Sequence, residues 1–505
     1  MQIRISHVRS YSVAVMSSLA IILFMSACRN KENLLSIVPA SSSGITFANM
    51  LEEREGLNIL YHINYYNGGG VSVADFNKDG LTDIYFTANS KGNNKLYLNK
   101  GNFVFEDITA KAGVAGTADW CSGSTIADVN ADGFPDIYVM VVAGKLGLKG
   151  HNQLFINNGN NTFTESAAKY GLDASALGEQ SAFFDYDRDG DLDCFILNQS
   201  DHPFAYIVDT SHRKEYDSLS GDRLLRNDCN TASGRFTDVS KTAGIWQSKL
   251  GYGLGLAVAD LNNDGWDDIY VSNDFHENDY YYVNNGNGTF TDAGRKHFRH
   301  FSRFSMGNDI ADYNNDGHLD VVTVDMLPNE EKILKTYGSD EQFDIYRQKI
   351  TSNGFLPQFS KNCLQRNNGN GESFSEVSLI SGVSATDWSW SPLFTDLDND
   401  GIKDLFVTSG IPKRPVDLDY VRFISNLYVQ KQMNRTTSLD KEALDKIPDG
   451  SSHPFIFQGN EDGIFTDKSM EWGTGEQKGY FNGAAWADLD NDGDVDLIVN
   501  SINAP

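Results

Sequence analysis

The sequence has few basic residues, few cysteines and little proline, and each shortage narrows the class of protein. Lys and Arg number 41 against 69 Asp and Glu, which gives a formal net charge of −28. This balance argues against a nucleic-acid partner and against adhesion to anionic lipid, because both require a basic face. The 11 prolines stand beside 46 glycines and 12% aromatic residues. Together with the scarcity of long helical patterns, this composition favours a β-rich chain with tight turns.

The five cysteines fit no zinc motif. Cys28 belongs to the N-terminal segment described next. Cys121, Cys194, Cys229 and Cys363 remain, and four cysteines allow three pairings between which the sequence does not choose. We expect them to be mostly buried, as small hydrophobic residues are.

The N-terminus is predicted to be an export signal. Arg4 and Arg9 precede an apolar run that ends at Met25-Ser26-Ala27-Cys28, and small residues before such a cysteine resemble a bacterial lipobox. We therefore expect a signal peptide over residues 1–27, lipidation at Cys28 and a linker over residues 28–43. An ordinary signal peptide or a short membrane anchor is the alternative. Lipidation predicts attachment to the bacterial outer membrane through the lipid anchor alone, with the side of the membrane left open.

A nine-residue pattern, D-x-[DN]-x-D-G-x-x-D, occurs seven times along the chain. Successive copies begin between 52 and 92 residues apart, at Asp75, Asp128, Asp185, Asp260, Asp312, Asp396 and Asp488. Recurrence of one pattern on this scale is the signature of a repeat fold. A small-residue strand precedes each copy and an apolar strand follows it. A third and a fourth strand usually complete the unit before the next copy begins.

Four strands per unit and seven units predict an all-β fold, a seven-bladed β-propeller over residues 44–505. Residues 44–50 read as a strand that closes the last blade. Only two strands follow the start of that blade before Pro505, so we expect the last blade to be incomplete and the natural protein to be longer. Three long insertions, at about 197–222, 326–361 and 409–453, lie between second and third strands. The second and third insertions have helical character.

The repeated pattern has the donor set of a calcium site. Calcium prefers six to eight oxygen ligands, and positions 1, 3, 5 and 9 offer side-chain oxygens while position 7 offers its carbonyl. Glycine at position 6 permits the sharp turn. A bare Asp-Gly hairpin turn is the alternative, and seven intact copies weigh against it. Up to seven calcium ions are predicted, with these ligands: Asp75, Asn77, Asp79, Leu81, Asp83; Asp128, Asn130, Asp132, Phe134, Asp136; Asp185, Asp187, Asp189, Asp191, Asp193; Asp260, Asn262, Asp264, Trp266, Asp268; Asp312, Asn314, Asp316, His318, Asp320; Asp396, Asp398, Asp400, Ile402, Asp404; Asp488, Asp490, Asp492, Asp494, Asp496.

These repeats resemble the FG-GAP/VCBS family, which includes the integrin α-chain propellers. Stretches such as GGGVSVADFNKDGLTDIYF and FNGAAWADLDNDGDVDLIV carry the resemblance. YVSNDFHENDYYYVNNGNGTF and TDWSWSPLF look like a narrower group, the bacterial lipoproteins whose propeller precedes an ASPIC/UnbV domain, although that domain is absent here. The resemblance implies a calcium-bound propeller in cell adhesion or extracellular ligand handling. It does not specify a ligand.

Two functions follow as expectations. The first is an exported cell-envelope module that binds a glycan or a protein ligand on the insertion-bearing face, with Tyr65, Trp120, Trp388 and Trp390 as contact residues. Packing between blades is the alternative role of these aromatics. The second function is a polysaccharide lyase or hydrolase that uses His276 and Glu277, helped by Arg303 or His62, for acid–base chemistry. A surface His-Glu pair is more often structural, so we expect binding rather than catalysis.

Overall fold

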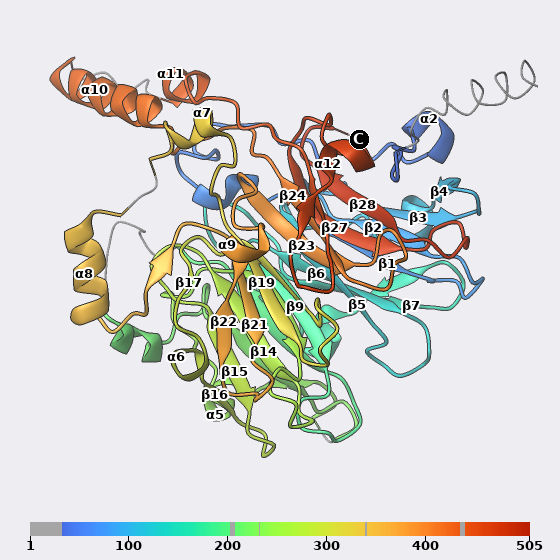
Figure 1. The fold of residues 1–505 in the computed structure, drawn as a ribbon. Helices are drawn as coiled ribbons and strands as arrows, with labels where there is room; N and C mark the ends of the chain where they lie inside the picture. Colours follow the sequence, from blue (N-terminus) through green and yellow to red (C-terminus); the bar gives the residue numbers. More distant parts are fainter. Residues whose placement is uncertain (1–32, 202–207, 232, 339–340, 435–439, 505) are drawn as a thin grey trace, which may run out of the picture.

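The computed structural model describes residues 33–201, 208–231, 233–338, 341–434 and 440–504 (Figure 1). The predicted signal peptide and Cys28 lie outside these residues. Within the described part of the chain, no helix is both long and apolar enough to cross a membrane.

Six four-stranded antiparallel sheets form the blades of a β-propeller. In each sheet the strands lie side by side in chain order, and long insertions separate the second strand from the third in three of the blades. The blades are β1 (Val71–Ala74), β2 (Asp83–Phe86), β3 (Lys95–Asn99), β4 (Phe105–Asp107); β5 (Cys121–Ala127), β6 (Asp136–Val141), β7 (Gln153–Asn157), β8 (Phe163–Glu165); β9 (Gly178–Phe184), β10 (Asp193–Asn198), β11 (Arg223–Asn227), β12 (Phe236–Asp238); β13 (Gly253–Ala259), β14 (Asp268–Asn273), β15 (Tyr280–Asn284), β16 (Phe290–Asp292); β18 (Gly307–Ala311), β19 (Asp320–Val324), β21 (Cys363–Asn367), β22 (Phe374–Glu376); β23 (Ser389–Thr395), β24 (Asp404–Ser409), β25 (Phe455–Gln458) and β26 (Thr466–Asp467).

The prediction of seven blades is wrong. The seventh repeat forms only a two-stranded hairpin of β27 (Phe481–Ala487) and β28 (Asp496–Ser501). The strand expected over residues 44–50 does not form. The backbone of this segment pairs with the hairpin only through a single bridge between Asn49 and Ile502. Without a third and a fourth strand the hairpin is not a blade. It lies between the sixth blade and the first, where β27 contacts both β23 and β1.

Hydrogen bonds join the hairpin to both neighbouring blades. The Asn500 amide donates to the carbonyls of Gly70 and Thr87 at 2.9 and 3.0 Å, and the Thr408 hydroxyl donates to the Asn482 carbonyl at 2.6 Å. The ring of six blades is therefore closed by a hairpin held on both sides.

Small residues fill the innermost strands because neighbouring blades converge on the axis. A Cβ added at Gly307 would lie 2.1 Å from the Trp390 carbonyl oxygen, and one at Gly123 would lie 2.6 Å from that of Glu179. Serine and threonine hydroxyls bridge adjacent blades here, as Thr125 does to the Ser181 carbonyl at 2.7 Å. The glycine-rich composition of these strands thus follows from backbone packing at the centre of the propeller.

The helices are short and lie outside the sheets. Single-turn helices follow the fourth strands, and each of the first three ends at a left-handed glycine such as Gly113 (φ 78°). This group comprises α3 (Thr109–Ala112), α4 (Ala167–Tyr170), α5 (Ser240–Ala243), α6 (Gly294–His297), α9 (Ser378–Ser381) and α12 (Ser469–Trp472). Near the N-terminus lie α2 (Ala40–Ser43) and η1 (Ile63–Tyr66).

The three long insertions join second strands to third strands, as predicted. They contain η2 (Thr210–Lys214) in the first, α7 (Glu331–Leu334) and α8 (Phe343–Thr351) in the second, and α10 (Leu418–Asn434) and α11 (Asp440–Asp445) in the third. The second also pairs β20 (Gln358–Phe359) with β17 (Phe301–Ser302) in parallel. Because successive strand connections alternate between the two ends of an antiparallel sheet, the insertions lie at the end opposite the Asp-rich loops.

Candidate metal centres and axial cavity

The seven Asp-rich loops share one hydrogen-bonded scaffold. In the first loop, Asp75 accepts hydrogen bonds from the backbone of Asp79 at 3.1 Å and of Gly80 at 2.8 Å. Asp79 in turn accepts from the backbone of Leu81 at 3.0 Å. The same contacts recur in the last loop, where Asp488 accepts from Asp492 at 3.2 Å and from Gly493 at 3.0 Å. The repeated sequence therefore encodes a repeated loop geometry.

Two positions of each loop have a left-handed backbone. The predicted glycine at position 6 has φ between 85° and 95° in all seven loops, which confirms the reason given for its presence. Position 4 is also left-handed, as at Asn399 (φ 57°) and Lys78 (φ 59°). Sequence reasoning missed position 4, although asparagine, which tolerates this conformation, occupies it in four loops.

Carboxylates converge in three loops, and in each of these loops at least one buried carboxylate oxygen has no hydrogen-bond partner. Ligand atoms of Asp185, Asp187 and Asp193 lie within 4.8 Å of one another, and the loops beginning at Asp396 and Asp488 contain similar groups. The Oδ1 atoms of the position-3 residues Asp187, Asp398 and Asp490 are buried and have no hydrogen-bond partner. A buried anionic oxygen without a partner is costly, so these residues suit a cation.

The other four loops carry asparagine at position 3. Its amide donates to the position-5 carboxylate, as Asn77 does to Asp79 at 3.0 Å, while its oxygen accepts from the same residue's backbone at 3.0 Å. These loops hold one carboxylate fewer and are internally better satisfied. The three loops with aspartate at position 3 therefore suit a cation better than the four loops with asparagine there.

The position-9 aspartates connect the loops to the blades. Asp83 accepts from the backbone of Phe76 at 3.0 Å and of Asn99 at 2.8 Å, and is fully buried. Burial raises its pKa to about 7, and burial likewise raises the pKa of Asp193 to about 8. Each retains lone pairs for a cation, whose charge would lower these pKa values.

An asparagine at the end of the third strand bonds to a neighbouring loop in four blades, and the sequence analysis did not identify this role. The Asn157 amide donates to the carbonyl of Phe76, position 2 of the preceding blade's loop, at 2.9 Å. Asn99, Asn284 and Asn367 make the equivalent contacts to Leu489, Tyr186 and Leu261. The signal was present as an Asn in the motifs KLYLN, QLFIN, YYYVN and CLQRN. These four residues anchor four of the seven loops to the next blade.

The predicted ligand-binding aromatics are mostly buried. Tyr65, Trp120 and Trp388 are 1%, 4% and 6% exposed and belong to the largest apolar cluster. Trp390 is half-buried, and its indole donates to the Gly410 carbonyl at 2.8 Å. Packing therefore accounts for the first three, and only Trp390 reaches a cavity. Their role in ligand binding stays a prediction.

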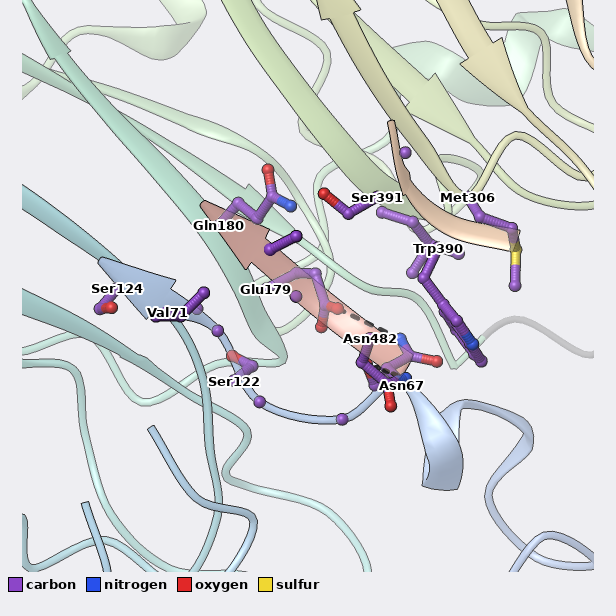
Figure 2. A pocket seen from close by; sticks show the side chains of 18 of the residues that line it. Asn67, Val71, Ser122, Ser124, Glu179, Gln180, Met306, Trp390, Ser391 and Asn482 are labelled. Carbon is purple, nitrogen blue, oxygen red and sulfur yellow. Dashed lines mark hydrogen bonds between the residues drawn. The ribbon is translucent and has the colours of Figure 1, made fainter. Parts of the chain in front are cut away.

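A cavity of about 240 Å³ lies on the propeller axis, lined by residues of the six innermost blade strands or the segments just before them, and of β27 (Figure 2). Glycine, serine and asparagine form most of its wall, and Trp390 and Met306 lie at one side. Glu179 is its charged residue. Its two oxygens accept hydrogen bonds from Gln199 and, at 3.2 Å, from Asn67. Burial raises the pKa of Glu179 to about 7.

The proposed acid–base residues are not paired with each other. Glu277 is buried and forms an ion pair with Arg213, whereas His276 lies 3.5 Å from Glu341. Arg303 approaches the same Glu341 at 3.8 Å. Burial lowers the pKa of His62 to about 4, which does not suit the acid–base role suggested for this residue. The second insertion thus supplies a carboxylate to His276 that the sequence did not suggest.

The cysteines follow the expectation. All four that the structure describes are free thiols, and Cys121, Cys194 and Cys363 are buried.

Comparison with known proteins supports the repeat assignment. Residues 75–139, 140–196, 260–323 and 352–407 match the family described as FG-GAP-like repeat. Cartilage acidic protein 1 of Xenopus tropicalis is 29% identical over 216 residues, and the human protein is 29% identical over 215. In each case 42% of this chain and 29% of the relative are matched, so the chain spans under a third of these relatives' length.

Two solved structures resemble this chain, each with low overall similarity to it. One shows an Agrocybe aegerita lectin that recognises non-reducing terminal N-acetylglucosamine, with 16% identity, 79% of each chain covered and a TM-score of 0.39. The other is the Bacillus licheniformis rhamnogalacturonan lyase, with 14% identity, 68% of this chain and 55% of that chain covered, and a TM-score of 0.33. Neither score supports an argument about function. The matched repeats, together with the blades and loops, support the FG-GAP β-propeller family for this chain.

Proposed function

We propose that this protein is a calcium-loaded propeller that serves as an extracellular binding module for a glycan or a protein. The observation that carries the calcium part is the set of buried, unpartnered position-3 oxygens of Asp187, Asp398 and Asp490. When bound, calcium would supply charge neutralisation and rigidity. Positions 1, 3, 5 and 9 would hold it with side-chain oxygens, and position 7 with its carbonyl.

The binding part rests on the insertions. Each carries at least one exposed apolar side chain: Tyr216 is 68% exposed in the first, Phe343 is 72% exposed in the second, and Val421 is 40% exposed in the third. Exposed apolar groups on loops that a rigid scaffold carries are typical of recognition surfaces. We therefore infer that the ligand binds at the end of the propeller that bears the insertions.

Ligand capture on glycan and protein arrays tests this assignment. Replacing Tyr216, Phe343 and Val421 together by serine should weaken capture at least tenfold without lowering the melting temperature. The matched control replaces Val104 and Ile464, which are 47% and 43% exposed in turns at the opposite end, by serine. Equal capture by both variants, or a loss only in the control, would overturn the assignment.

A polysaccharide-processing enzyme is the second candidate, and the cluster around Glu341 favours it. His276, Arg303 and Lys349 all lie within 4 Å of this carboxylate, and burial lowers the pKa of Lys349 to about 8. Turnover on a panel of polysaccharides, lost in His276→Ala, would support catalysis. Binding without turnover would leave the binding module as the function.

We also propose export and lipid anchoring at Cys28, on the strength of the Met25-Ser26-Ala27-Cys28 sequence. Mass spectrometry of the mature N-terminus should find an acylated cysteine as the first residue. An unmodified N-terminus at another residue would contradict the anchor.

A further inference from the structure

The axial cavity contains an unneutralised carboxylate. Glu179 lines it from β9 and accepts amide hydrogen bonds from Gln199 and Asn67. Within the described ranges, no Lys, Arg or His forms an ion pair with Glu179, and no other ionisable side chain lines the cavity. Glu179 is half-buried. Two amides stabilise an anion only partly, and removing a charge from water without a counter-charge is costly.

Two asparagines that line the same cavity, Asn482 and Asn308, have an unpartnered side-chain amide oxygen. Asn482 is 1% exposed, and its amide nitrogen donates to the carbonyls of Tyr66 and Asn67, both at 3.0 Å. These two acceptors fix the orientation of the amide, since a flipped group would place oxygen against oxygen. The Oδ1 atom of Asn482 therefore points away from these two carbonyls, and it is buried without a hydrogen-bond partner. Figure 2 shows Asn482, Asn67 and Glu179 side by side at the cavity.

Asn308, which also lines the cavity, adds a second oxygen of this kind. Its amide donates to the Ser272 hydroxyl at 2.8 Å, which leaves its Oδ1 buried and without a hydrogen-bond partner. The cavity wall thus provides one carboxylate and two amide oxygens that lack donors. Such a set matches a hard cation and does not match an anion or an apolar ligand.

We propose that the axial cavity binds one divalent cation, with Glu179 as its charged ligand and Asn482 Oδ1 as a neutral ligand. The site is separate from the seven Asp-rich loops, and its volume of about 240 Å³ leaves room for the ion to keep several waters. Because it lies where the innermost strands and the closing hairpin meet, an ion there would hold β9 and β27 to a common centre.

The test counts calcium bound to the full chain at saturation. Glu179→Gln, which keeps the shape of the side chain and removes its charge, should lower the count by one ion per chain. The exposed Glu461→Gln is the matched control and should leave the count unchanged. Asp396→Ala should remove a loop ion without altering the difference that Glu179→Gln makes, which separates this site from the calcium-loop proposal.

Thermal melting provides a second readout that does not depend on the count. At pH 8, calcium should raise the melting temperature of Glu179→Gln by less than it raises that of the unsubstituted protein, because the variant lacks the charged ligand of the axial ion. An unchanged count, or a melting difference that calcium does not alter, would overturn the axial site and indicate that a proton neutralises Glu179.

Discussion

At the residue scale, the central aromatics act first through packing. Trp388 is 6% exposed and contacts Trp390, with ring centroids 6.4 Å apart. Trp388→Ala should therefore lower the free energy of unfolding by about 3–5 kcal/mol, as loss of a buried tryptophan does. Urea denaturation measures this directly. A variant of unchanged stability that has lost ligand binding would instead assign Trp388 to the binding site.

Asp222 gives a pH-dependent prediction at the same scale. It is 4% exposed, and its carboxylate accepts from the backbone of Asn198 at 3.1 Å. Burial raises its pKa from 3.8 to about 8, so the folded state holds the proton more tightly than the unfolded state. The contribution of Asp222 to the free energy of unfolding is therefore fully present below about pH 4 and is lost as the pH rises through about 8.

Asp222→Asn should remove that part of the pH dependence, and at pH 8 the variant should be more stable than the parent. Unfolding midpoints between pH 4 and pH 9 provide the measurement, with the exposed Asp462→Asn as control. Parallel pH profiles for the parent and Asp222→Asn would contradict the assignment.

At the element scale, the third strand does more than complete the sheet in four of the blades. Asn157 at the end of β7 donates to Phe76 in the preceding loop and to Pro135 in its own loop, at 2.9 and 3.1 Å. Asn157→Ala leaves both carbonyls without this donor and should cost about 1–3 kcal/mol of stability. The neighbouring exposed Asn158→Ala is the control for chemical denaturation. Equal effects of the two substitutions would show that the inter-blade contact is unimportant.

The elements were largely predictable, and the exceptions have physical reasons. Strand positions followed from the repeat, because the Asp-Gly loop fixes the turn and the apolar run after it, such as Asp136–Val141, is buried on both faces. The sequence could not show that the strand predicted over residues 44–50 would fail to form. Whether a strand pairs depends on contacts across more than 400 residues of sequence, and only the bridge from Asn49 to Ile502 forms. The axial site was hidden for the same reason, since Glu179 and Asn482 are remote in sequence.

At the scale of the whole molecule, the loops form a nearly continuous ring. Position 4 of one loop contacts position 6 or 7 of the next: Asn263 bonds to His318 at 2.9 Å, Asn399 to Asp494 at 2.7 Å, and Asn491 to the Gly80 carbonyl at 3.2 Å. Ordering one loop should therefore help to order its neighbour.

Calcium titration by calorimetry should accordingly show positive cooperativity, and Asn399→Ala, which removes one such contact, should reduce it. Asn161→Ala is a suitable control, because this residue lies in a turn between β7 and β8. An unchanged Hill coefficient in Asn399→Ala would show that the loops bind independently.

The central claim is that calcium neutralises the acidic loops and stabilises the folded propeller. Each site filled at a hundred times its Kd adds about 2.7 kcal/mol to the free energy of unfolding, and several sites add. Asp260→Ala removes the first ligand of a loop in the middle of the chain and should forfeit one such increment.

Differential scanning calorimetry in millimolar calcium and in chelator tests the claim most directly. We predict a melting temperature well above the chelator value in calcium, with a smaller difference for Asp260→Ala. The same melting temperature in calcium and in chelator would contradict the account.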